Sequence, residues 1–347
     1  QGYSSAASDV YKRQGYGIVE QQGTQNPEED ETTCRTLTTE DLISEELLLP
    51  QPEETQQTAL IPESVEATAG TALSNFRPAV QQVQIDRTQL ADYETLVRNF
   101  YAIDANTMAG SDQLSVEKLL GMDMTLPQEG DGPQILIYHT HSQEAFADSV
   151  PGDVNTGIVG VGECLTKILT EQYGYRVLHN TGQYDVETRD NAYSRALPAV
   201  EQILAENPSI QVIIDLHRDE VAEETKLVTD IQGRPTARFM FFNGLSRTRK
   251  TGDIDYLANE NQEANLAFSF QMQLKAAEYY PGLTRRIYLK GYRYNMHLRP
   301  RTLLVELGAQ NNTVEEAINA CDPLAHILDM VLKGCLLYTS PSPRDCS

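Results

Sequence analysis

The stretch 135–144 (ILIYHTHSQE) joins an apolar run to a group of metal-type ligands. Residues 135–138 are typical of a short buried strand. His139, His141 and Glu144 follow directly, and polar groups at the end of a buried strand in an α/β sheet are where active sites usually lie. The spacing of His141 and Glu144 lets an imidazole and a carboxylate meet one metal ion. The stretch therefore predicts a strand that leads into a metal site.

Beyond this stretch, segments with helical periodicity alternate with short apolar runs. We expect helices at 159–172, 193–206, 260–280 and 314–332, and strands at 176–178, 210–216, 237–242, 286–289 and 302–307. This alternation predicts a single α/β domain over residues 131–334, with a mixed, largely parallel sheet flanked by helices. Residues 81–130 are expected to form a helical lead-in that packs on the domain, with helices at 89–102 and at 115–121, the second capped by Ser115.

Two later strands also carry residues that a hydrolase uses. His217 follows one long apolar run, and Glu306 lies near the end of the last one. Two neutral imidazoles and one carboxylate bind Zn²⁺ with a fourth position open for water, so we expect His141, Glu144 and His217 as ligands. A carboxylate in an apolar strand is costly unless it is paired or functional. The role that suits Glu306 is general base, taking a proton from water and returning it to the leaving amine.

Further candidates surround these four residues. Asp215, two positions before His217, is expected to orient that imidazole as an acceptor. His139 shares a strand face with His141, which makes it either a supporting donor or a competing ligand.

Three polar residues outside the ligand set are candidates for substrate contacts. Arg218 either contacts substrate or pairs with Asp219 to shape the loop. Arg293 and Asn295, in the polar aromatic run GYRYN, are expected to contact substrate or the groups that hold the ligands.

Charge and composition exclude some functions and divide the chain. The net charge of −23 argues against nucleic acid as a partner, because phosphate binding needs basic patches. Residues 15–80 hold 13 acidic and two basic residues, a composition that predicts a disordered acidic linker. Residues 1–14 and 335–347 resemble translated sequencing adapters, so a membrane anchor is expected to be missing from this sequence. Outside those ends only Cys34, Cys164 and Cys321 remain, which predicts neither a disulfide framework nor a cysteine zinc site.

Several motifs together resemble the stage II sporulation protein P family of cell-wall hydrolases. They are LVRNFYAID (96–104), PQILIYHTHSQEAFADS (133–149), VGVGECL (159–165), VIIDLHRD (212–219), GYRYN (291–295) and LLVELGAQNNTVEEA (303–317). More distantly, the ELG-x-x-x-N segment at 306–312 resembles the ending of zinc-dependent N-acetylmuramoyl-L-alanine amidases. The resemblance implies an amidase- or carboxypeptidase-like α/β fold and cleavage of the N-acetylmuramoyl-L-alanine amide of peptidoglycan, with some cutting of peptide cross-links. It also implies a membrane-anchored, extracytoplasmic enzyme at the sporulation septum, acting during engulfment with stage II sporulation proteins D and M.

The resemblance assigns His141 and His217 as zinc ligands and Glu306 as the catalytic base, but leaves the third ligand open. The related amidases place a Glu at the start of the first helix, and the equivalent position here falls near Asn155, a poor ligand. Glu144 is our choice, since HxxE with a distant His is a zinc pattern of carboxypeptidase-like folds. Glu163 is the alternative ligand.

Two other functions compete with the amidase. One is a carboxypeptidase-like peptidase acting on stem peptides, and the other is a wall-binding scaffold that has lost its metal. Retention of all four candidate residues favours an enzyme.

Overall fold

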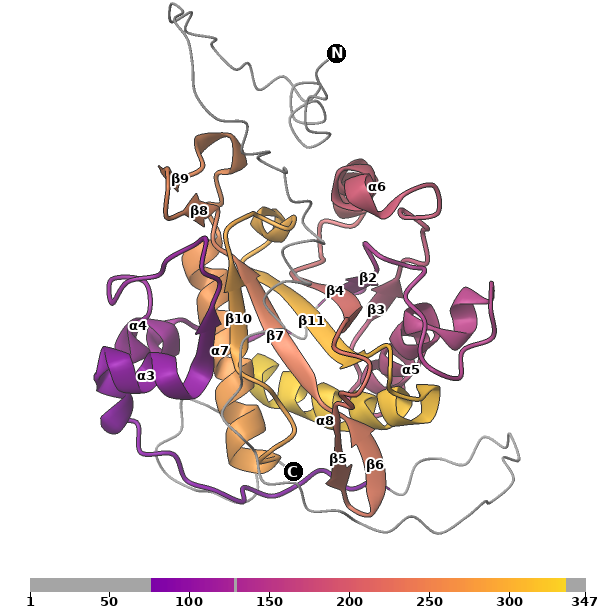
Figure 1. Ribbon diagram of the computed structural model, residues 1–347, viewed down its shortest axis with the longest axis horizontal. Coiled ribbons are helices and arrows are strands. Elements are labelled where there is room, and N and C mark those ends of the chain that lie inside the picture. Colours follow the sequence, from indigo (N-terminus) through magenta and orange to yellow (C-terminus); the bar gives the residue numbers. More distant parts are fainter. Residues whose placement is uncertain (1–75, 128–129, 335–347) are drawn as a thin grey trace, which may run out of the picture.

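The computed structural model describes residues 76–127 and 130–334, so the acidic linker and both terminal segments lie almost wholly outside the described part. A seven-stranded sheet runs through the centre in the order β1-β10-β7-β11-β4-β2-β3 (Figure 1). All neighbouring strands are parallel except β11 and β7. The prediction of a mixed, largely parallel α/β sheet is confirmed.

The elements fall close to the predicted segments. The sheet strands are β1 (Tyr101–Ile103), β2 (Ile135–Tyr138), β3 (Val177–His179), β4 (Val212–Asp219), β7 (Phe239–Gly244), β10 (Ile287–Lys290) and β11 (Arg301–Ala309). Two hairpins stand apart from the sheet, β5 (Val228–Ile231) with β6 (Arg234–Ala237) and β8 (Arg247–Thr248) with β9 (Gly252–Asp253). The helices are α3 (Tyr93–Phe100), α4 (Val116–Gly121), α5 (Ile158–Glu171), α6 (Ala192–Glu206), α7 (Gln262–Tyr279) and α8 (Val314–Leu332).

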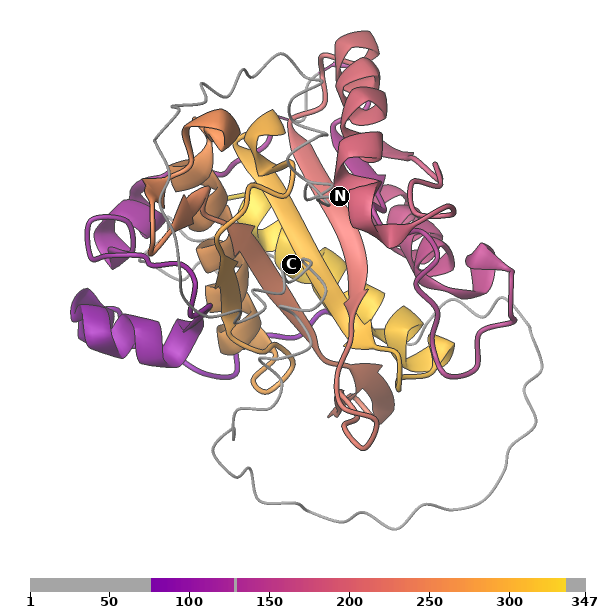
Figure 2. The same cartoon turned by 45° about the horizontal axis from the view of Figure 1, so that its top comes forward.

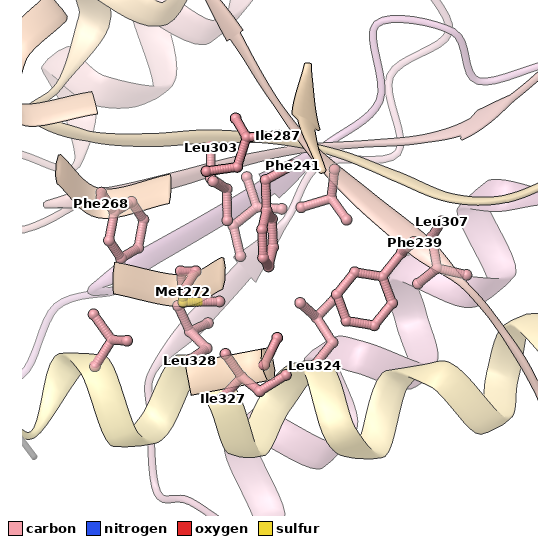
Figure 3. Close-up of a cluster of buried hydrophobic side chains, with 14 of the residues drawn as sticks. Phe239, Phe241, Phe268, Met272, Ile287, Leu303, Leu307, Leu324, Ile327 and Leu328 are labelled. Carbon is pink, nitrogen blue, oxygen red and sulfur yellow. The ribbon is translucent and has the colours of Figure 1, made fainter. Parts of the chain in front are cut away.

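Helices cover both faces of the sheet. The main core lies between the sheet and α5, α7 and α8, where Phe239 and Phe241 of β7 meet Phe268 of α7 and Leu324 of α8 (Figure 3). A smaller cluster joins the opposite face of β2 and β4 to α6, which lies across the sheet from α8 (Figure 2). Each fully buried side chain of this size contributes about 1.5–3 kcal/mol relative to exposure.

Three local details differ from the sequence predictions. The lead-in is not only helical, because Tyr101–Ile103 pairs with β10 as an edge strand of the main sheet. Ser115 precedes α4 without a side-chain cap. The strand expected at 237–242 begins instead at Phe239, since Ala237 belongs to the β5–β6 hairpin, whose two-residue turn at Gln232 and Gly233 has positive φ at both positions.

Candidate metal and catalytic site

Three sheet segments bring the candidate residues to one place. The loop after β2 carries His141 and Glu144, and β4 carries His217. Strand β11 pairs with β4 in parallel, and this register sets Glu306 directly beside His217. Residues more than 160 positions apart in the sequence thus meet at one edge of the sheet, as the carboxyl ends of parallel strands do.

His141, Glu144 and His217 form a compact buried group. Their ligand atoms all lie within 4.8 Å of one another. His141 Nδ1 lies 3.5 Å from Glu144 Oε1, and His217 Nδ1 lies 3.5 Å from Glu144 Oε2. Tetrahedral zinc with bonds of about 2.0–2.1 Å separates its ligand atoms by about 3.4 Å. The spacing of these side chains therefore fits zinc with little movement.

Glu144 is held in place by two donors. Arg189 Nη2 lies 2.9 Å from Oε1, and the backbone N–H of Arg218 donates to Oε2 at 2.7 Å. A carboxylate has about four lone-pair sites, so each oxygen keeps one for a metal. Burial raises the pKa of Glu144, but the neighbouring imidazoles and the Arg189 guanidinium outweigh burial and hold that pKa well below its usual value. Glu144 is thus anionic at neutral pH.

Asp215 orients the His217 ring. Its Oδ1 lies 2.9 Å from His217 Nε2, although the two atoms are not aligned for a full hydrogen bond. Thr140 fixes the carboxylate, because its N–H donates to Oδ1 at 2.9 Å and its hydroxyl to Oδ2 at 2.7 Å. Burial lowers the pKa of His217, but the carboxylates of Asp215 and Glu144 outweigh burial and raise that pKa well above its usual value.

Glu306 sits next to this group with an unsatisfied carboxylate atom. Its Oε2 is buried and has no hydrogen-bond partner. Burial, with the like charges of Asp219 and Glu144, raises the pKa of Glu306 to about 8, against the opposing charges of His217 and Arg285. Buried polar groups are rarely left unpaired, so this atom points to a partner that arrives with substrate or metal.

His139 and Glu163 belong to a different set of contacts. His139 Nδ1 donates to the Leu216 carbonyl at 2.8 Å, and its Nε2 lies 2.9 Å from His179 Nε2. His179 Nδ1 in turn lies 3.0 Å from Glu163 Oε2, and the Glu163 side chain is 72% exposed. The structure brings neither residue into the group of three ligand atoms.

The Leu216 carbonyl, at one end of this series of contacts, decides the tautomer of His139. A carbonyl only accepts, so His139 Nδ1 carries the proton and neutral His139 accepts at Nε2 from His179. At the other end, His179 Nδ1 faces the Glu163 carboxylate. His139, His179 and Glu163 thus contact one another in series and stand outside the group of candidate ligands.

Arg218 and Asp219 do not pair with each other. The Arg218 guanidinium donates to the backbone carbonyls of Ala145 and Asp219, each at 3.1 Å, while the Asp219 carboxylate pairs with Arg285. Of the two alternatives for Arg218, the ion pair with Asp219 is not formed, because Arg285, just before β10, reaches that carboxylate instead.

Arg293 and Asn295 are buried and make contacts within the protein. Arg293 Nη1 donates to the Ala258 carbonyl at 3.1 Å. Asn295 has a positive φ, and its Nδ2 donates to the Tyr193 carbonyl at 2.9 Å. Asn295 thus supports a residue that borders the ligands.

Two residues beside the ligands were not anticipated from the sequence. Tyr193 stacks on the His217 ring, with ring centroids 6.3 Å apart, and meets His141 edge-on at 5.6 Å. Arg189, which contacts Glu144, lies one helical turn before Tyr193, where the chain enters α6. Both side chains reach the candidate ligands, Arg189 at Glu144 and Tyr193 at the two imidazoles. Nothing in the sequence linked α6 to the metal-type ligands, so no sequence signal pointed to either residue.

Comparison with known proteins identifies the family. A model of stage II sporulation protein P matches residues 19–329. The chain belongs to the stage II sporulation protein P family. Stage II sporulation protein P of Bacillus subtilis (strain 168) is 26% identical over 217 residues, which are 57% of this chain and 51% of that protein. The chain thus spans about half the length of this curated relative of the stage II sporulation protein P family.

Several solved structures of N-acetylmuramoyl-L-alanine amidases are distantly similar to this chain. The N-acetylmuramoyl-L-alanine amidase AmiC2 of Nostoc punctiforme is 13% identical, with a TM-score of 0.36, and the match covers 60% of this chain and all of that one. An N-acetylmuramoyl-L-alanine amidase from Clostridium difficile 630 is 14% identical, with a TM-score of 0.37, covering 61% and 100%. Among the described residues of this chain, no helix is long and apolar enough to cross a membrane.

Proposed function

We propose that the chain is a zinc-dependent peptidoglycan hydrolase that cleaves the amide between N-acetylmuramic acid and L-alanine. One observation carries the proposal: two imidazoles and a carboxylate converge within 4.8 Å, and a further carboxylate with a buried, unpaired oxygen lies on the neighbouring strand. Membership of a sporulation family whose matched relative is stage II sporulation protein P supports a role in wall remodelling during engulfment.

His141, Glu144 and His217 would hold the metal. The donor set is that of hydrolytic zinc sites, which keep one position open. Zinc in such a site polarises a carbonyl and lowers the pKa of water. Asp215 would keep His217 in the tautomer whose Nδ1 binds, since its carboxylate lies 2.9 Å from Nε2. Burial lowers the pKa of His141, which favours the neutral ring that ligation needs.

Glu306 would move the proton. It would accept a proton from the attacking water and return it to the nitrogen of the leaving L-alanine. Its buried Oε2 and raised pKa suit a group that must hold a proton between two steps. Tyr193 would restrict the His217 and His141 rings to one orientation.

The proposed location and partners of the enzyme are supported by its family membership alone. We propose an extracytoplasmic, membrane-anchored enzyme at the sporulation septum that acts with stage II sporulation proteins D and M. Its substrate in that setting is the peptidoglycan between the two membranes.

Digestion of purified peptidoglycan tests the activity. The expected products are glycan strands freed of peptide and stem peptides with free N-terminal L-alanine, identified by mass spectrometry. A chelator should abolish release and added Zn²⁺ restore it. Glu306→Gln should lose activity while still binding zinc, whereas Glu117→Gln, an exposed carboxyl on α4, should behave as wild type.

Two other outcomes of this digestion would contradict the amidase proposal. Cleavage only within stem peptides would make the chain a peptidase with the same site. Zinc-free protein that binds wall without cutting it would make the chain a scaffold.

A further inference from the structure

Helices α5 and α8 bring two cysteines together that lie far apart in the sequence. The helices pack against each other, and Cys321 Sγ of α8 lies 3.5 Å from the Val161 carbonyl of α5. Cys164 lies one turn after Val161, and helical side chains lean back over the preceding turn. The Cys164 thiol is therefore directed toward the region of α8 that Cys321 Sγ occupies, and each thiol shifts the pKa of the other.

We propose that Cys164 and Cys321 are a redox pair that closes into a disulfide between α5 and α8. Sequence spacing predicts no disulfide framework, and both residues are free thiols in this structure. The packing of the two helices supplies the proximity that spacing does not.

The two thiols differ in a way that orders the reaction. The neighbouring Cys321 thiol lowers the pKa of Cys164, and Cys164 is only half-buried. The Cys164 thiol, together with burial, raises the pKa of Cys321 well above its usual value. Cys164 is therefore the thiol that attacks first, because the thiolate is the nucleophile.

The oxidant is a small-molecule or protein disulfide. The Cys164 thiolate attacks one sulfur of that disulfide and displaces the other as a thiolate. Cys321 then loses its proton and attacks Cys164 Sγ, which releases the second thiol. The protein gains one S–S bond and loses two protons and two electrons, and the oxidant is reduced to two thiols.

The bond would brace the loop that carries Glu144. The N–H of Ile158, the first residue of α5, donates to the Glu144 carbonyl at 2.9 Å. At the start of α8, the Val314 N–H donates to Asp148 Oδ1 at 2.7 Å. Both helices thus begin beside this loop, and a cross-link between them limits their relative movement.

Peptide mapping of the full chain tests the pair. The protein is treated with oxidised glutathione, remaining thiols are alkylated, and it is digested without reduction. We expect one cross-linked peptide containing Cys164 and Cys321, and a thermal midpoint that rises by about 5–10 °C and falls again with reductant. Stable glutathionylation of Cys164, or alkylation of both residues after oxidation, would overturn the proposal.

Variants keep the test independent of folding defects and of catalysis. Cys164→Ser and, separately, Cys321→Ala should each abolish the cross-linked peptide and the redox-dependent rise. The control variant Cys34→Ser should keep both the cross-linked peptide and the redox-dependent rise in thermal midpoint. A rise that persists in either of the first two variants would contradict the pair, and none of these readouts depends on the proposed hydrolase activity.

Discussion

His217 Nε2 lies 2.9 Å from Asp215 Oδ1, and this contact decides which ring nitrogen faces the other candidate ligands. With Nε2 directed at the carboxylate, Nδ1 is turned toward Glu144. A carboxylate behind a ligating imidazole fixes its tautomer and raises its basicity.

Asp215→Asn should therefore weaken zinc binding by about 10–100-fold, because an amide is a poorer acceptor for the imidazole N–H. Competition with a coloured chelator measures the affinity. Asp253→Asn, which removes a surface carboxylate paired with Arg247, is the matched control and should leave the affinity unchanged. Equal zinc affinities for Asp215→Asn and wild type would mean that Asp215 does not support zinc binding.

Glu144→Gln and Glu163→Gln separate the two candidate third ligands. Zinc at 100 times its dissociation constant should stabilise the wild-type protein by about 2.7 kcal/mol. Because Glu144 adjoins both imidazoles and Glu163 contacts only His179, the zinc-dependent rise in thermal midpoint should vanish in the first variant and persist in the second. Differential scanning fluorimetry with and without zinc measures it, and the reverse result would assign Glu163 as the ligand.

Glu306 should make the metal-free protein less stable as pH rises. Burial raises its folded pKa from 4.5 to about 8, so the folded state binds the proton more tightly than the unfolded state. Stability from this group is complete below about pH 4.5 and is lost as pH rises to about 8. Glu306→Gln carries no such proton, so its stability relative to wild type should increase by roughly 1–3 kcal/mol between pH 5 and pH 8.5.

Urea unfolding of chelated protein at both pH values measures the change. Glu117→Gln, which removes an exposed carboxyl, is the control and should track wild type at both. A pH-independent difference between Glu306→Gln and wild type would mean that Glu306 is not held with a raised pKa.

Gly162→Ala should disrupt the contact between the imidazoles of His139 and His179. A Cβ at this position would lie 2.5 Å from His139 Nε2 and 2.7 Å from His179 Nε2, so one imidazole must move. We expect a loss of about 1–3 kcal/mol in the free energy of unfolding. Gly121→Ala, where a Cβ meets nothing within 4 Å, is the matched control and should be neutral or stabilising by up to about 1 kcal/mol.

Equal stabilities for the two alanine variants would show that the His139–His179 contact is loose. Histidine NMR signals of the Gly162→Ala protein would locate the disturbance at His139 and His179 directly.

The sequence by itself determined the α/β class, the order of the elements and the family. Those features depend on local periodicity and contiguous motifs, as in α8, whose predicted bounds and Thr313–Glu316 capping box are both local. Local pattern also marked His141, Glu144, His217 and Glu306 as unusual, because polar groups at the ends of apolar runs stand out.

Only the tertiary structure decided which of those groups meet. The parallel register of β4 and β11 sets Glu306 beside His217, and the loop after β2 brings Glu144 to both imidazoles while Glu163 faces His179. Strand β1, Arg189, Tyr193 and the Cys164–Cys321 pair were invisible to spacing for the same reason. Contacts between distant segments depend on sheet order and helix packing, which no short stretch of sequence encodes.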